Sequence, residues 1–393
     1  MKVLVASLSD PSSDPRPARM VDFLLCEGYE VDVLGYTPDK SNGSVKNYFA
    51  IARAAGSMAS KIARRAVTIL VRIIPNIRQF DRLKDSLNDI KIGVYIYRDL
   101  LANNKYDLIV VEDLQLLPLA FTLKRDGRVL FDAREYYPLQ FNESRKFRIF
   151  EKGERIRLCR RYLGKCDAAL TVSGGLARQY KQDFNVPMTV YRSVPKRASS
   201  MAAHSVGPVI TMVHHGVANR NRKIEKMIAI AGACKPRLTL DLFLVGDQRY
   251  IAELKNISQQ YENVTICEPM EFGEINAVLA NYDVGFYILE PTSFNLRYAL
   301  PNKLFEYIQA GLAVIIGPSP EMAEVVTKYG CGIVLPSFNE DEVSSLLREI
   351  TSDQIADTKA KARIAAEDLC YESEKQVLIP VLGDLDRRKI EDS

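Results

Sequence analysis

The sequence has almost no excess of charge. Its 393 residues carry 53 Lys and Arg against 49 Asp and Glu, a net charge of +4, whereas a dedicated nucleic-acid binder is basic over the whole domain. Its seven cysteines are widely spaced and form no C-x-x-C, which argues against a zinc ribbon and a disulfide framework. No G-x-G-x-x-G follows the first apolar run, so a lone dinucleotide dehydrogenase is set aside.

Long hydrophobic runs are also missing. The longest, residues 66–74, is interrupted by Arg72 and is well short of the ~20 residues that a spanning helix needs. The apolar start, residues 3–8, continues into Ser9-Asp-Pro11 rather than a cleavage site. We therefore expect a cytoplasmic protein, either free or held peripherally at the inner face of the cell membrane.

Short apolar runs alternate with helical patterns along the chain, which predicts parallel sheets covered on both faces. We expect strands at 3–8, 31–34, 108–111, 129–131 and 168–172, and again at 209–213, 240–245, 264–266, 284–288, 313–316 and 332–334. A small, polar stretch separates the two series and is typical of a linker. The prediction is an α/β protein of two doubly wound domains. The first domain covers residues 1–195 and the second covers 208–370, with a linker at 196–207 between them. A C-terminal helix at 371–393 is expected to return to the first domain.

The first domain contains an insertion at 40–105 with an unusual charge. Residues 40–80 hold eight Lys or Arg and no Asp or Glu. A helical wheel gathers Ile51, Ala55, Met58, Ile62, Ala66, Ile69 and Ile73 into one apolar stripe. Such a basic amphipathic helix either packs its stripe on the sheet or lies on an anionic bilayer. Residues 145–165 are also basic, with nine Lys or Arg against two Glu, which favours an anionic partner surface further.

Two segments of the second domain predict an anion site. Pro301 begins a helix whose first amides, with Lys303, would face an anion. Glu306, one turn later, is placed to accept hydrogen bonds from a ribose on the same diphosphate. Gly216 follows a strand and permits close approach of a ligand to the backbone, while Arg222 offers a bidentate contact to a phosphate. The alternatives are an ordinary amphipathic helix and a solvated loop.

These segments resemble the retaining glycosyltransferases of family 4, which have the GT-B fold of two facing Rossmann-like domains. The resemblance rests on Pro301-Asn-Lys-Leu-Phe-Glu-Tyr307 followed by Ala-Gly-x-x-Val-Ile, on Phe131-Asp-Ala-Arg-Glu-Tyr-Tyr-Pro138, and on the stretch from Asp167 to Leu176. It covers nearly the whole chain except residues 40–105.

The resemblance implies a nucleotide-sugar donor held by the second domain. Arg222 and Lys303 would contact the diphosphate and Glu306 the ribose, and these three are the expected catalytic residues. Gly216, Asn295 and Asn302 would complete the donor site. Fixed cations and helix amides would stabilise the departing diphosphate, so we expect neither a metal nor another cofactor.

The donor-sugar or acceptor side is expected in the first domain, at Ser12, Ser13, Asp14, Arg134 and Glu135. Arg134 stands where the family has a histidine, and it is suited to neutralising a phosphate or a carboxylated sugar. Tyr298 stands where many members have a first glutamate.

The predicted function is therefore transfer of a sugar, with retention, from a nucleotide-sugar to a saccharide or lipid-linked acceptor in cell-surface polysaccharide biosynthesis. The expected partners are these substrates and an anionic membrane surface at 40–80, but no nucleic acid. Two alternatives remain. A nucleotide-sugar epimerase can share the fold, although no histidine precedes His204. A non-catalytic nucleotide-sugar-binding scaffold of a polysaccharide assembly complex fits the substitutions at Tyr298 and Arg134.

Overall fold

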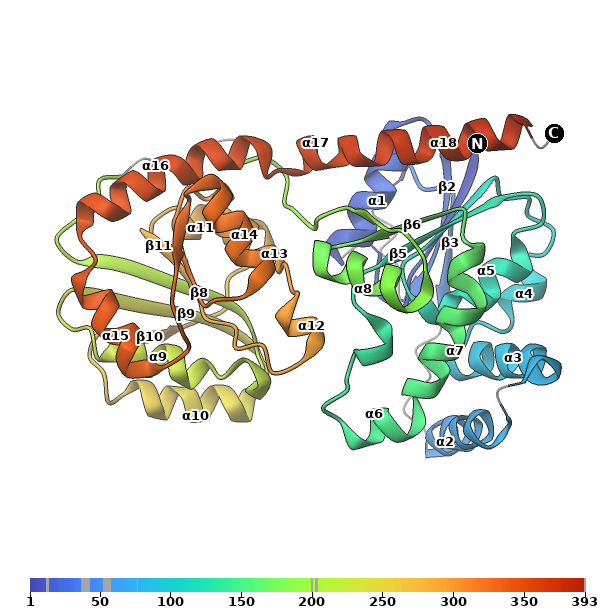
Figure 1. Cartoon of the computed structure of the whole chain (residues 1–393), viewed down its shortest axis with the longest axis horizontal. Coiled ribbons are helices and arrows are strands. Elements are labelled where there is room, and N and C mark those ends of the chain that lie inside the picture. The colour runs from blue at the N-terminus through green and yellow to red at the C-terminus, as the bar shows by residue number, and fades with distance from the viewer. Residues whose placement is uncertain are drawn as a thin grey trace. The chain divides into compact units, whose positions relative to one another are not determined.

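The computed structural model describes residues 1–11, 14–36, 43–51, 58–75, 77–198, 201 and 204–391. It divides into two compact units, one of residues Met1–Tyr191 with Val377–Ser393 and one of Arg192–Gln376 (Figure 1). No helix in these ranges is long and apolar enough to cross a membrane.

The first unit is built on a seven-stranded parallel sheet. Its order is β3 (Asn47–Ile51), β2 (Glu30–Tyr36), β1 (Lys2–Ala6), β4 (Leu108–Val111), β5 (Arg128–Ala133), β6 (Ala168–Thr171) and β7 (Thr189–Val190). The central strands are continuous apolar runs because both faces of the sheet are covered. Val3 pairs with Val31 on one side and with Leu108 on the other, and all three are buried.

The helices of this unit are α1 (Pro15–Cys26), α2 (Met58–Ile73), α3 (Asp81–Ile92), α4 (Tyr97–Leu100), α5 (Leu117–Leu123), α6 (Arg145–Phe150), α7 (Lys152–Tyr162), α8 (Gly174–Phe184) and α18 (Leu378–Glu391). Helix α2 packs on α3, α6 and α7 (Figure 1). The basic stretch 145–165 is two helices that meet at Glu151, not one.

The insertion differs from the prediction in one respect. Ile51 belongs to strand β3, where it is buried beside Tyr36 of β2, so it is not part of the helical stripe. This short edge strand shows no alternation of buried and exposed side chains, so no strand signal is visible before the helical period that follows. Ala55 lies outside the described residues.

The second unit holds a six-stranded parallel sheet. Its order is β10 (Val264–Cys267), β9 (Leu238–Gly246), β8 (Ile210–Ala218), β11 (Val284–Tyr287), β12 (Ala313–Ile316) and β13 (Gly332–Val334). All six strands were predicted. The helices are α9 (Ile224–Gly232), α10 (Gln248–Ser258), α11 (Ile275–Leu279), α12 (Phe294–Arg297), α13 (Asn302–Gln309), α14 (Pro320–Tyr329), α15 (Glu340–Glu349), α16 (Ser352–Asp368) and α17 (Tyr371–Glu374).

Candidate functional site

The order of strands in the second sheet reverses between β8 and β11, since β9 and β10 continue on one side and β12 and β13 on the other. Ligands of open parallel sheets bind beyond the carboxyl ends of the strands at such a point. The segment that leaves β8 contains Arg222, and α13 lies in the connection from β11 to β12. Both predicted anion-binding segments therefore reach this edge.

Gly216 brings the two predicted cations together. Its φ is +123°, a conformation that favours glycine. A Cβ atom at this position would lie 2.8 Å from Lys303 Nζ and 3.8 Å from Arg222 Nη1. Arg222 lies in the short turn before α9 rather than at the helix start, and its Nη1 donates to the carbonyl of Val217 over 3.1 Å. The position of the Lys303 amine thus leaves no room for a Cβ atom at residue 216, whereas Arg222 would only be in ordinary contact with it.

Lys303 is the second residue of α13, and only 7% of it is exposed. Its Nζ donates to the carbonyl oxygen of His215 over 2.6 Å and lies 4.6 Å from the centroid of the Tyr287 ring. Burial, and then the nearby Arg222, lowers the pKa of this amine well below its usual range, although Glu306 opposes the shift. No described carboxylate forms an ion pair with Lys303. An anion bound beside this amine would therefore favour its charged form.

Glu306 lies one turn after Lys303, on the same helix face. Its Oε2 is 3.2 Å from Nε2 of His215, without the alignment of a hydrogen bond. Leu304 and Ile308, on the opposite side of the helix, are fully buried in the core. Partly exposed Glu306 can therefore accept hydrogen bonds from a ligand at the same place where the cations meet.

The start of α13 is open in the way an anion site requires. Pro301 is its N-cap residue, and no side chain caps the helix. The amide of Leu304 bonds to the Pro301 carbonyl over 3.1 Å, while Asn302 is the first helical residue. Asn295 lies in α12, the short helix before it. Gly311 follows the helix with a φ of +76°, the left-handed conformation that glycine favours just past a helix end.

Arg134 follows β5 in the first unit and is already paired. Its guanidinium forms an ion pair with Asp14, and its Nη2 lies 3.1 Å from Oδ2 of Asp113. Its charge is thereby compensated. Glu135 is half-buried, and burial raises its pKa, although a hydrogen bond from Gln140 opposes the shift. Ser12 and Ser13 lie outside the described residues.

Sequence reasoning placed Asp14 on the same side as Arg134 but missed two other carboxylates that act on this arginine. Glu112 and Asp113 follow β4 directly, and polar side chains immediately after a buried strand were the available signal. Glu112 is fully buried, and neither of its oxygens has a hydrogen-bond partner among the described residues. Burial, and then Asp132, raises its pKa well above the usual range. Asp132 itself receives two hydrogen bonds, of 2.8 and 2.6 Å, from the buried guanidinium of Arg16.

Within the described ranges no group of three or more His, Cys, Asp or Glu could hold a metal ion. His214 and His215 face opposite ways, as expected for neighbours in a strand. The first bonds to the carbonyl of Phe286, over 3.0 Å, and the second packs edge-on against the Tyr307 ring.

No known family model matches the sequence, and no curated protein matches it. Solved structures do. A sucrose-phosphate synthase from Thermosynechococcus elongatus superposes with a TM-score of 0.71 at 14% identity, over 100% of both chains. An E. coli trehalose-6-phosphate structure bound with UDP-2-fluoro glucose gives 0.66 at 12%, over 97% of this chain and 99% of that one. Anabaena HepE in complex with UDP and glucose gives 0.66 at 12%, over 98% and 99%. The chain therefore has the GT-B fold of glycosyltransferases.

Proposed function

We propose that the protein is a retaining hexosyltransferase that moves a sugar from a nucleotide-sugar donor to a saccharide or lipid-linked acceptor. The observation that carries this proposal is the convergence of Arg222, Lys303 and Gly216 where the second sheet reverses its strand order. Similar folds are solved with UDP and with a UDP-sugar analogue, which supports the choice of donor.

The donor site is proposed to act on the leaving group. When the bond between the sugar and the diphosphate breaks, negative charge grows on the diphosphate oxygens. Arg222, Lys303 and the open amides of α13 are fixed at one place before the reaction, so they stabilise this charge without reorganising. The donor phosphate would take the proton of the attacking hydroxyl, and neither a protein base nor a metal is then required.

The acceptor is proposed to bind by its hydroxyl groups. Asp14 and Asp113 flank Arg134, so a phosphate at this edge would meet two carboxylates as well as one guanidinium. Sugar hydroxyls, in contrast, can donate to the carboxylates. This charge balance favours an uncharged saccharide over the phosphate or carboxylated sugar expected from Arg134 alone, and it suits polysaccharide biosynthesis.

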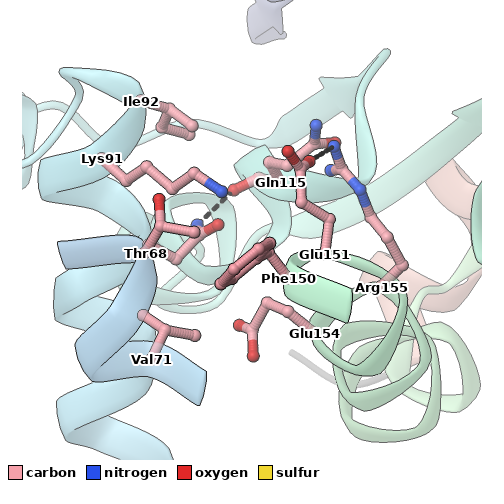
Figure 2. A pocket seen from close by; sticks show the side chains of 10 residues that line it. Thr68, Val71, Lys91, Ile92, Gln115, Phe150, Glu151, Glu154 and Arg155 are labelled. Carbon is pink, nitrogen blue, oxygen red and sulfur yellow. Dashed lines mark hydrogen bonds and ion pairs between the residues drawn. The ribbon is translucent and has the colours of Figure 1, made fainter. Parts of the chain in front are cut away.

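We further propose that α2 contacts an anionic membrane. The described part of its apolar stripe points outward: Ile69 is 48% and Ile73 71% exposed, and Arg65 and Arg72 are exposed beside them. The inner side of the helix instead presents Thr68 and Val71, which line a hollow of about 80 Å³ together with Lys91 and Phe150 (Figure 2). The stripe is thus available to acyl chains and the cations to lipid phosphates.

Incubation of the protein with a panel of nucleotide sugars tests the enzymatic proposal. Slow hydrolysis of one donor to free nucleotide and free sugar is the expected result. Appearance of an epimeric sugar would instead indicate the epimerase, and binding without turnover of any donor would indicate a scaffold.

A further inference from the structure

Two recesses open in the first unit, and none of their lining residues belongs to the candidate site. One, of about 530 Å³, is lined by residues of α3, α5 and α7, and the other, of about 350 Å³, lies along α7. Arg161 and Lys165 line both. The two recesses therefore share a wall, and together they are large enough for a small ligand.

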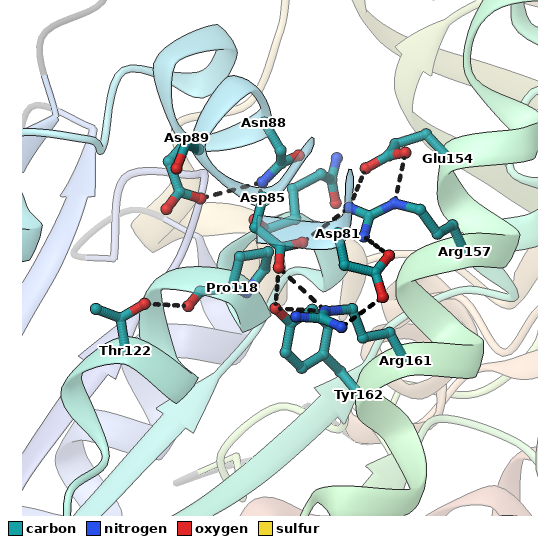
Figure 3. A network of polar contacts seen from close by, with 12 residues as sticks. Asp81, Asp85, Asn88, Asp89, Pro118, Thr122, Glu154, Arg157, Arg161 and Tyr162 are labelled. Atoms are coloured by element: carbon teal, nitrogen blue, oxygen red, sulfur yellow. Dashed lines mark hydrogen bonds and ion pairs between the residues drawn. The ribbon is translucent and has the colours of Figure 1, made fainter. Parts of the chain in front are cut away.

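A charge-balanced network forms part of the lining of both recesses, to which it contributes Asp81, Asp85, Arg157 and Arg161 (Figure 3). Arg157 contacts Asp85 at 2.9 Å and Glu154 at 2.6 Å, and Arg161 contacts Asp81 at 2.6 Å and Asp85 at 3.0 Å. Burial lowers the pKa of the neighbouring Lys84, and Glu154 opposes the shift. Three cations and three carboxylates thus largely compensate one another, and Arg161 is held in place by two of the acids.

Four cations are left over around the recesses. These four cations are Arg78, Arg82, Arg160 and Lys165. All four are exposed, and no described carboxylate forms an ion pair with any of them. Lys165 packs its amine over the Tyr162 ring, 5.7 Å from the centroid. Since the whole chain has a net charge of only +4, this small area holds an excess as large as that of the entire protein.

We propose that the joined recesses, called here the basic basin, bind a phosphate group that carries two or more negative charges. Guanidinium groups match phosphate oxygens in pairs, and the carboxylates that would repel an anion are already engaged by Arg157 and Arg161. Arg98, which also lines the larger recess, likewise forms an ion pair with Asp89, over 2.6 Å. No described carboxylate forms an ion pair with any of the four remaining cations, so their charges are available to an anion.

The ligand belongs either to a lipid headgroup or to a soluble polyphosphate. Leu83 is 49% and Ile77 48% exposed beside the basin, and the outward stripe of α2 lies on the neighbouring helix. Apolar side chains next to a phosphate site are typical of a surface that meets lipid.

The test uses inorganic pyrophosphate as the first probe. The affinity of the protein for pyrophosphate is measured by calorimetry in the Arg222→Ala variant. This background weakens the donor site, so that it contributes little to the measured binding. Adding Arg82→Ala, Arg160→Ala and Lys165→Ala should weaken binding at least tenfold and reduce its salt dependence. A matched control removes three exposed cations of the second unit by Lys255→Ala, Lys328→Ala and Lys361→Ala, and it should leave binding unchanged.

The second probe is vesicles of phosphatidylcholine, alone or mixed with phosphatidic acid, whose phosphate monoester can carry two negative charges. Loss of sedimentation with the anionic vesicles in the basin variant, but not in the control, supports a lipid headgroup. Loss of pyrophosphate binding alone supports a soluble ligand. If the basin variant binds both probes as tightly as the control, the proposal is wrong. Donor hydrolysis by the basin variant in the otherwise natural chain should persist, so this test and that of the proposed transferase can fail separately.

Discussion

Lys303 Nζ donates to the carbonyl oxygen of His215 over 2.6 Å, joining two residues that are 88 positions apart. The bond fixes the amine at the end of strand β8, next to Arg222 and above the face of Tyr287. Helix α13 thus contributes both its open amides and a buried cation to the same small volume. Most of the following predictions depend on this arrangement.

Replacement of Gly216 by alanine should abolish donor binding while the protein stays folded. The new methyl group would lie 2.8 Å from Lys303 Nζ, and the φ of +123° strains any residue with a side chain. The control is Gly383→Ala in α18, where the added Cβ meets no atom within 4 Å and should stabilise the helix by about 0.5–1 kcal/mol. Thermal unfolding and nucleotide titration check both. Normal affinity in Gly216→Ala would contradict the close approach.

Binding of a nucleoside diphosphate should take up protons. Burial lowers the pKa of Lys303 in the free protein, and a bound dianion raises it again, so the complex holds more protons than the free state. Affinity should accordingly fall as the pH rises through the pKa of the free amine. Calorimetry in buffers of different ionisation enthalpy measures the uptake. The Lys303→Met variant should lose both the uptake and most of the affinity, whereas equal uptake by the two proteins would refute the assignment.

Glu306→Gln should weaken binding of a nucleotide-sugar about 10- to 100-fold, because this is the usual contribution of a hydrogen bond to a charged group. The loss should vanish with a donor whose ribose lacks both hydroxyls, because that analogue never uses the carboxylate. Dissociation constants for the two donors and the two proteins give the comparison. An equal loss with both donors would mean that Glu306 acts by holding His215 rather than by contacting ribose.

Asp89 gives the stability of the protein a predictable pH dependence. Burial raises its pKa to about 6, although Arg98 opposes the shift. Between about pH 4 and 6 the folded state therefore holds more protons than the unfolded state, and this group makes folding less favourable as the pH rises. Asp89→Asn removes the effect, so the Tm of the variant minus that of the natural protein should increase over this range. A constant difference would disprove it.

Most of both sheets, and the approach of Arg222 and Lys303 to one edge, could be predicted from sequence because each depends on a local pattern, whereas the short strands β3 and β7 were missed. Strands buried on both faces are uninterrupted apolar runs, and the Pro301 start and the Gly311 end of α13 are visible in its sequence. The contact of Arg134 with Asp113 could not be predicted, since Asp113 follows β4 and only the strand order of the first sheet brings it beside the end of β5. The burial of Lys303 could not be predicted either, because its acceptor is the backbone carbonyl of His215 in β8, 88 positions earlier in the chain.

The central claim, that Arg222 and its neighbours hold a nucleoside diphosphate, is tested most directly by comparing Arg222→Ala with Arg220→Ala. Arg220 is the same residue type two positions away, but it is exposed, paired with Glu253 and stacked over Tyr250. Calorimetric titration with UDP should show at least a tenfold loss of affinity for Arg222→Ala and an unchanged affinity for Arg220→Ala. Equal affinities for both variants and the natural protein would contradict the account.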